Sequence, residues 1–163
     1  MTHISVGNFQ KDLKISKKTV KALFQSLIDF KNLSVDELEV NFITDKAMRI
    51  KHDELFSDPS PTDCITCPID DPYDSTEGYC VLGSCFICPK TAINYSATEV
   101  KDPYEELSLY CVHCFLHLIG YDDIEPSERK KMRSQEKICM EHLKKKGLLI
   151  TNQNKDNFNQ LKY

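Results

Sequence analysis

The sequence has little of what marks a membrane-spanning, exported or strongly basic protein. No apolar run in its 163 residues approaches the roughly 20 residues that a transmembrane helix needs, so we expect no membrane partner. The first ten residues lack the charged and then apolar order of a signal peptide, which predicts a cytoplasmic protein. Positive charge is not in excess either, since the net charge is −4 and the pI about 5.7. Any contact with a polyanion would therefore depend on local basic patches.

The composition that is present is that of a globular domain. Hydrophobic residues make up 40% of the chain and charged residues 28%, and the chain is long enough to bury a core. It contains no internal repeats. We predict one domain over residues 1–150, followed by a frayed tail at 151–163 that is rich in Asn, Gln and Lys.

Eight cysteines raise the question of a structural metal site. The pairs Cys64/Cys67 and Cys85/Cys88 have the spacing of a zinc ribbon. Each pair, however, lies in a strand-like run, where residues i and i+3 point to opposite faces, and neither is followed by a glycine that would ease a turn. We therefore predict small buried thiols. A zinc-ribbon binding module stays open as an alternative interpretation.

Hydrophobic periodicity predicts an α+β domain with a mixed sheet of about four strands and helices packed on it. The acidic, turn-rich residues 69–78 would join two of the strands as a long hairpin-like loop. The predicted strands are 3–9, 38–43, 64–67 and 79–88, and the predicted helices are 17–30, 45–55, 103–119 and 126–146.

One stretch carries a specific chemical pattern, H-x3-H-x2-G-x2-D. His113 and His117 are four residues apart and would share one face of a helix. Gly120 suits the end of that helix, because it can turn left-handed without steric cost, and the turn would bring Asp122 or Asp123 back toward the imidazoles. Two imidazoles and one carboxylate are the ligands of a known class of catalytic zinc site. The plainer interpretation is two half-buried helix residues and an ordinary cap.

The residue between the histidines argues against one kind of metal chemistry. Cys114 follows His113 at the position where zinc peptidases of the H-E-x-x-H type carry their glutamate base. A thiol cannot take the role of that carboxylate. Peptide hydrolysis by this route is therefore not expected.

Three motifs in order resemble those of the YbeY family of bacterial ribosomal RNA maturation factors. The segment from His113 to Asp123 is similar to the family's H-G-x-L-H-L-x-G-Y-D-H. Upstream, Pro61 to Pro68 looks like P-T-D-V-L-S-F-P, and Leu82 to Pro89 looks like L-G-D-I-V-I-S-P. Downstream, Met132 and Glu136 match the family's M-x3-E. In the family the strand positions held here by cysteines are mostly apolar.

The resemblance covers roughly residues 36–143 and implies a zincin-like fold with the metal-site helix lying across the sheet. It implies a single-metal endoribonuclease that helps form the 3′ end of small-subunit (16S) rRNA and clears defective ribosomes. The implied partners are ribosomal RNA, the small ribosomal subunit or one of its proteins, and an assembly GTPase.

Three residues depart from the family at functional positions. Asp123 replaces a third metal-binding histidine, Ser84 replaces a strand aspartate, and Phe56 stands where an arginine is expected. A carboxylate is an acceptable zinc ligand and also favours harder ions such as Mn²⁺ or Mg²⁺. Phe56 cannot hold a phosphate or offset charge in a transition state. These departures would lower the activity.

The resulting hypothesis is one divalent ion, Zn²⁺ first and Mn²⁺ or Mg²⁺ otherwise, whose bound water attacks an RNA phosphodiester. Its predicted ligands are His113, His117 and Asp123. Asp122 or Asp63 would assist catalysis by accepting the free N–H of an imidazole. Arg49 or Arg129 would bind the substrate in place of the missing arginine. A second hypothesis is a ribosome assembly factor with weak or no nuclease activity.

Overall fold

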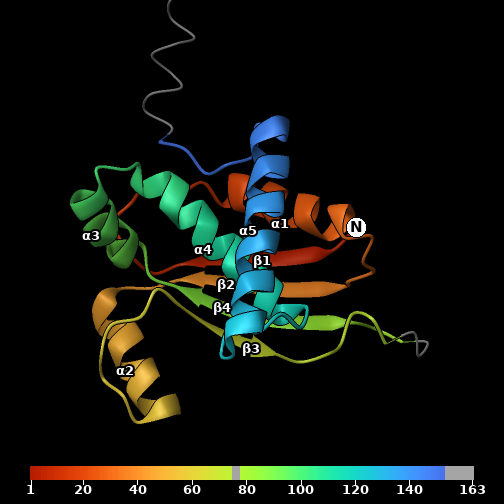
Figure 1. Cartoon of the computed structure of the whole chain (residues 1–163), viewed down its shortest axis with the longest axis horizontal. Helices are drawn as coiled ribbons and strands as arrows, with labels where there is room; N and C mark the ends of the chain where they lie inside the picture. The colour runs from red at the N-terminus through yellow and green to blue at the C-terminus, as the bar shows by residue number, and fades with distance from the viewer. Residues whose placement is uncertain (75–77, 153–163) are drawn as a thin grey trace, which may run out of the picture.

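The computed structural model describes residues 1–74 and 78–152 (Figure 1). Residues 153–163, most of the tail that we predicted to be frayed, lie outside the described residues. The elements in chain order are β1 His3–Asn8, α1 Lys17–Phe30, β2 Glu37–Phe42, α2 Asp45–Phe56, β3 Cys64–Pro68, β4 Val81–Ile87, α3 Pro89–Glu99, α4 Pro103–Leu118 and α5 Pro126–Lys146.

The four strands form one mixed sheet in the order β1-β2-β4-β3. The pairs β1–β2 and β2–β4 are parallel, and β3 pairs antiparallel with β4 at the edge. Cys64 lies opposite Ile87, and Pro68 lies opposite Gly83. The α+β class and the mixed four-stranded sheet are therefore confirmed. The strands β3 and β4 are antiparallel neighbours, as a hairpin-like connection requires, and residues 75–77 of the predicted loop lie outside the described residues.

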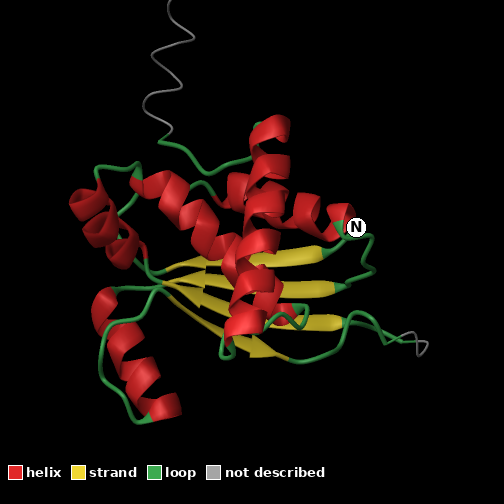
Figure 2. Cartoon of the chain, in the orientation of Figure 1, coloured by secondary structure: helices red, strands yellow, loops and turns green. Residues whose placement is uncertain are grey.

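The helices build two further layers on the sheet (Figures 1 and 2). Helices α1 and α4 pack on the strands, and α5 packs on α1 and α4. Local sequence explains α1: Ser16 accepts a hydrogen bond from the Thr19 N–H at 3.3 Å, and one stripe of the helix is buried. That stripe consists of the predicted residues Val20, Leu23, Phe24, Leu27 and Ile28. The same packing layer holds α4 rigidly across the sheet.

One helix was absent from our prediction. We took Pro89 only as the end of a strand, but it is the first residue of α3. A proline at this position is favourable because its missing N–H would be unbonded anyway and its φ suits a helix. The buried side chains of α3 are small ones, Pro89, Ala92 and Ser96, so the sequence carries little hydrophobic contrast there.

The cysteines do not form a zinc ribbon. Cys64 and Cys85 contact the main core, whereas Cys67 and Cys88 belong to a second cluster with Ile43, Met48 and Ile65. All eight are free, and no cysteine belongs to a group of three or more possible metal ligands in the described ranges. Burial raises the pKa of the Cys111 and Cys114 thiols well above the ordinary value. The prediction of buried thiols is therefore confirmed for Cys85 and Cys88, whereas Cys64 and Cys67 are half-buried, and the ribbon interpretation is wrong.

Helix α2 projects from the edge of the fold (Figure 1, lower left). Met48 is its buried residue, whereas Ile50, Leu55 and Phe56 are large apolar residues that remain exposed. The helix ends at Ser57, which is left-handed with φ of 54°.

None of the helices in the described part of the chain has both the length and the apolar character needed to cross a bilayer.

Candidate metal centre

The two histidines are presented by the C-terminal half of α4. Asp102 caps this helix by accepting the Tyr104 N–H at 3.0 Å, and Pro103 begins it. His113 and His117 are both half-buried, on the side of the helix that faces β3. Their rings are perpendicular, with centroids 4.5 Å apart and the two Nε2 atoms 3.0 Å apart. The i, i+4 spacing thus gives the shared face that the sequence predicts.

A Schellman turn at the end of α4 brings the carboxylate of Asp123 back toward the two imidazoles. Gly120 has φ of +108°, its N–H donates to the His117 carbonyl at 3.1 Å, and the Tyr121 N–H donates to the Leu116 carbonyl at 3.0 Å. Because this turn reverses the chain, Asp123 lies beside both imidazoles. Its Oδ2 is 3.4 Å from the Nε2 of His113 and 3.6 Å from that of His117.

These separations fit a small divalent ion. A tetrahedral ion with bonds of about 2.1 Å holds its ligand atoms about 3.4 Å apart. The three donor pairs here are 3.0, 3.4 and 3.6 Å apart. No other trio of His, Cys, Asp or Glu side chains within residues 1–74 and 78–152 brings its donor atoms within 4.8 Å of one another. This group can therefore bind a metal ion.

The Nδ1 atom of His113 is hydrogen-bonded to Glu136 of α5. The Nδ1 of His113 is 3.0 Å from Glu136 Oε1, and Glu136 is only 5% exposed. Burial acts to lower the pKa of His113, but the hydrogen bond to Glu136 and the negative charges around the ring outweigh it and raise the pKa. A carboxylate bonded to Nδ1 fixes the ring and leaves Nε2 directed at the ion. We had expected this role of Asp122 or Asp63.

The other predicted site residues lie in different places. Asp63 lines the same pocket, with its Oδ1 accepting the Cys64 N–H at 2.8 Å, whereas Asp122 is exposed. Arg129 donates to the Ile124 carbonyl at 2.8 Å and so braces the loop next to the predicted ligand. Arg49 is paired with Asp45 at 2.8 Å on exposed α2. Their roles in catalysis and substrate binding stay predictions.

The metal centre opens into a pocket of about 300 Å³. Two residues of α2, His52 and Phe56, form part of its wall. The remaining lining comes from the residues around β3 and from the metal centre: Thr62, Asp63, Cys64, Ile65, Thr66, His113, His117 and Asp123. The family resemblance had indicated position 56, and the i, i+4 spacing was the sequence signal that could have added His52.

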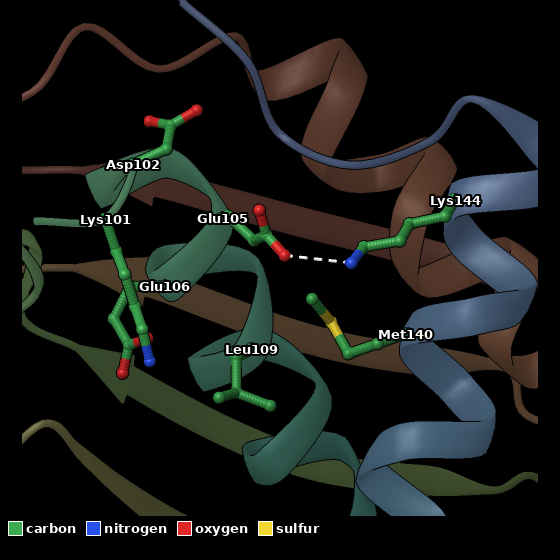
Figure 3. A pocket seen from close by; sticks show the side chains of 7 residues that line it. All are labelled: Lys101, Asp102, Glu105, Glu106, Leu109, Met140 and Lys144. Atoms are coloured by element: carbon green, nitrogen blue, oxygen red, sulfur yellow. Dashed lines mark ion pairs between the residues drawn. The ribbon is translucent and has the colours of Figure 1, made fainter. Parts of the chain in front are cut away.

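A larger hollow of about 390 Å³ lies at the opposite end of α4 (Figure 3). Glu105 and Lys144 form an ion pair of 2.9 Å across it, above Leu109 and Met140. Its lining holds no imidazole or thiol. Because the oppositely charged groups already satisfy each other, we place the chemistry at the histidines.

A mixed sheet crossed by a helix that carries two imidazoles, with a carboxylate returned by a turn, defines an α+β domain with a group that could hold a metal ion, as metal-dependent hydrolases do. The comparisons make this more specific: the chain belongs to the YbeY family. The family model described as Endoribonuclease YbeY matches residues 5–144. The predicted resemblance is confirmed, and the family model and the relatives below carry the description of an endoribonuclease.

Individual relatives agree with the family match. The chain is 42% identical to an Endoribonuclease YbeY of Chlamydia felis over 151 residues, covering 91% of this chain and 95% of the relative. It is 40% identical to that of Protochlamydia amoebophila over 147 residues, covering 90% and 97%. A solution structure of a Thermotoga maritima protein has a TM-score of 0.60 at 19% identity and covers 86% of this chain and 89% of that one. That likeness concerns the fold alone.

Removing the buried carboxylate tests how His113 is positioned. We expect Glu136→Ala to weaken zinc binding by about 10- to 100-fold, because the ring loses its fixed orientation. Glu136→Gln should recover part of this loss, since its amide oxygen can still accept the Nδ1 proton. Competition with a zinc-binding dye measures the affinity. Glu141→Ala, an exposed site on the same helix, should match the parent. Equal affinity of Glu136→Ala and the parent would contradict the role.

Proposed function

We propose that the protein is a single-metal endoribonuclease that cleaves precursor small-subunit (16S) rRNA near its 3′ end and serves ribosome quality control. The observation that carries this proposal is a group of three possible metal-ligand atoms, separated from one another by 3.0, 3.4 and 3.6 Å, in a chain of this family. The small ribosomal subunit or one of its proteins, and an assembly GTPase, are the partners that we propose from the family resemblance.

His113, His117 and Asp123 would hold the ion, with Zn²⁺ proposed first and Mn²⁺ or Mg²⁺ as alternatives. When bound, such an ion acidifies water and offsets the charge that develops on a phosphodiester. Glu136 keeps the imidazole of His113 in place. In the pocket wall, Asp63 is our candidate proton acceptor, because its carboxylate lines the pocket together with the candidate ligands and is held there by hydrogen bonds to the Cys64 N–H and the Thr62 hydroxyl.

The test is metal-dependent cleavage of an RNA that spans the 16S 3′ end and its precursor extension. We expect discrete fragments from the zinc- or manganese-loaded protein, no fragments after chelation, and restored cleavage when the ion is added back. A preparation of the His113→Ala, His117→Ala double variant controls for contaminating ribonuclease. Cleavage that persists in the double variant or in chelator would overturn the proposal.

Phe56 favours a second candidate, a ribosome assembly factor with weak or no nuclease activity. This residue is 62% exposed in the wall of the pocket and offers no charge to a phosphate. Ser84 is less informative, because its hydroxyl bonds to Glu39 at 3.3 Å and it does not line the pocket. Complementation of an rRNA maturation defect by the histidine double variant would favour this candidate. Loss of complementation would favour the nuclease.

A further inference from the structure

Helix α2 carries one face that begins in the core and ends at the metal centre. Met48, His52 and Phe56 follow each other at intervals of four residues and therefore share a side of the helix. Met48 is fully buried, His52 is half-buried and Phe56 is 62% exposed. Since the helix projects from the body of the protein (Figure 1), this apolar face continues beyond the core. Its uncovered part is the part that lines the pocket.

The two rings at the end of this face are held in place. The Nδ1 of His52 lies 2.9 Å from the Ser60 carbonyl oxygen, which fixes the imidazole. The ring of Phe56 lies against it, with centroids 5.3 Å apart and planes 59° apart. The helix then stops, because Ser57 is left-handed and its N–H donates to the Asp53 carbonyl at 2.8 Å. The aromatic pair is thus a preorganised surface on a defined element.

The pocket lining combines two kinds of chemistry. The candidate metal ligands and the two aromatic rings both line it, and residues in and around β3 complete the lining. The volume of about 300 Å³ is at the lower end of the range for small-ligand sites. A nucleotide whose phosphate is at the metal centre would have a base within this same small space. Exposed aromatic rings are the groups on which unpaired bases stack.

The negative charge of the protein is a further reason to expect an RNA contact that does not depend on charge. The protein has a net charge of −4, and the pocket wall itself contains the carboxylates Asp63 and Asp123. The lining contains no Lys or Arg, so the pocket wall itself offers little attraction to the RNA backbone. Stacking on an aromatic ring does not require positive charge on the protein, so it can hold the substrate where Lys and Arg contacts are scarce.

We propose that Phe56, supported by His52, is a stacking platform for one unpaired base next to the phosphodiester at the metal centre. This inference rests on the proposed function and names a contact that selects single-stranded over paired RNA, because a paired base is not free to stack on the protein. Phe56 is then a substrate-binding residue, and His52 is a positioning residue that acts through it.

Fluorescence tests the contact without requiring cleavage. The chain contains no tryptophan, so Phe56→Trp introduces a single indole on the platform. Leu55→Trp is the matched control, because Leu55 is 53% exposed on the same turn and does not line the pocket. With zinc present, a short single-stranded oligoadenylate should quench Phe56→Trp and leave Leu55→Trp unchanged. An oligomer of abasic nucleotides should quench neither.

Kinetics on a cleavable RNA gives the second measurement. Phe56→Ala should raise KM by at least about fivefold, with a smaller change in kcat, because a stacked base is lost. Phe56→Leu should be impaired as much as Phe56→Ala if stacking matters, and as active as the parent if only apolar packing matters. Phe56→Tyr should keep the parent KM. Leu55→Ala serves as the control that should leave KM unchanged.

The two measurements separate this inference from the proposed function. A parent KM in Phe56→Leu, or equal quenching at positions 55 and 56, would overturn the platform even if the parent cleaves RNA in a metal-dependent way. Base-dependent quenching confined to Phe56→Trp supports the platform even if the parent shows no cleavage. In that second case the nuclease proposal fails and the platform belongs to an RNA-binding factor.

Discussion

Asp123→Ala is expected to reduce the bound metal from about one ion per chain to less than a tenth of that. The variant keeps His113 and His117 but loses the carboxylate whose Oδ2 lies 3.4 and 3.6 Å from their Nε2 atoms. Two imidazoles alone supply only two of the four ligands of a tetrahedral ion. RNA cleavage should fall by at least about 100-fold, since loss of residues that only support ligands already costs 10- to 100-fold. Elemental mass spectrometry of protein purified without a metal-affinity column measures the content.

Two variants make this experiment decisive. Asp123→His should retain the ion, because an imidazole is also a zinc ligand and the Gly120 turn that positions residue 123 is unchanged. Cys64→Ser should retain it too, because Cys64 packs against the core instead of joining a ligand group. A full complement of metal in Asp123→Ala would show that the third ligand lies elsewhere. Metal loss in Cys64→Ser would instead show that a cysteine thiolate is a metal ligand.

The parts of the centre that sequence predicted are those that local geometry determines. The helix start at Asp102, the shared face of His113 and His117, and the reversal at Gly120 each follow from residues within a few positions of one another. Caps, i, i+4 pairs and left-handed turns are properties of one segment and do not depend on the rest of the fold. The arrangement of the candidate ligands was therefore predictable before any tertiary structure.

The parts that were missed depend on contacts between distant segments. Glu136 pairs with His113 across 23 residues, and whether it faces α4 depends on how α5 lies on that helix. The family resemblance indicated position 56 as functional, but His52 was missed, because it lines the pocket only through the way α2 projects beside β3. Asp63 and Asp122 were equally reasonable partners for the imidazole on local grounds. Tertiary packing places Glu136 at the Nδ1 of His113, and the roles of Asp63 and Asp122 stay predictions.

Gly83→Ala is expected to destabilise the protein by about 3 kcal/mol or more, which combines a strained backbone with overpacking. Gly83 has φ of +142°, a backbone conformation that residues with a Cβ rarely adopt. A Cβ there would lie 2.3 Å from the Cys67 carbonyl oxygen and 3.0 Å from the Pro68 Cα, both backbone atoms of β3. The two strands would have to separate. The expected fall in Tm is roughly 6–12 °C for a chain of this size.

This substitution also links the sheet to the metal centre. The added Cβ would meet Leu118 of α4 at 3.0 Å, one residue after His117, and β3 supplies part of the pocket lining. Zinc affinity should therefore fall together with stability. Gly78→Ala is the control, because a Cβ there meets nothing within 4 Å. Thermal unfolding of apo and zinc-loaded protein measures both quantities. An unchanged Tm would contradict the strain at Gly83, whereas a lower Tm with unchanged zinc affinity would mean that α4 and its turn hold the ligands without help from β3.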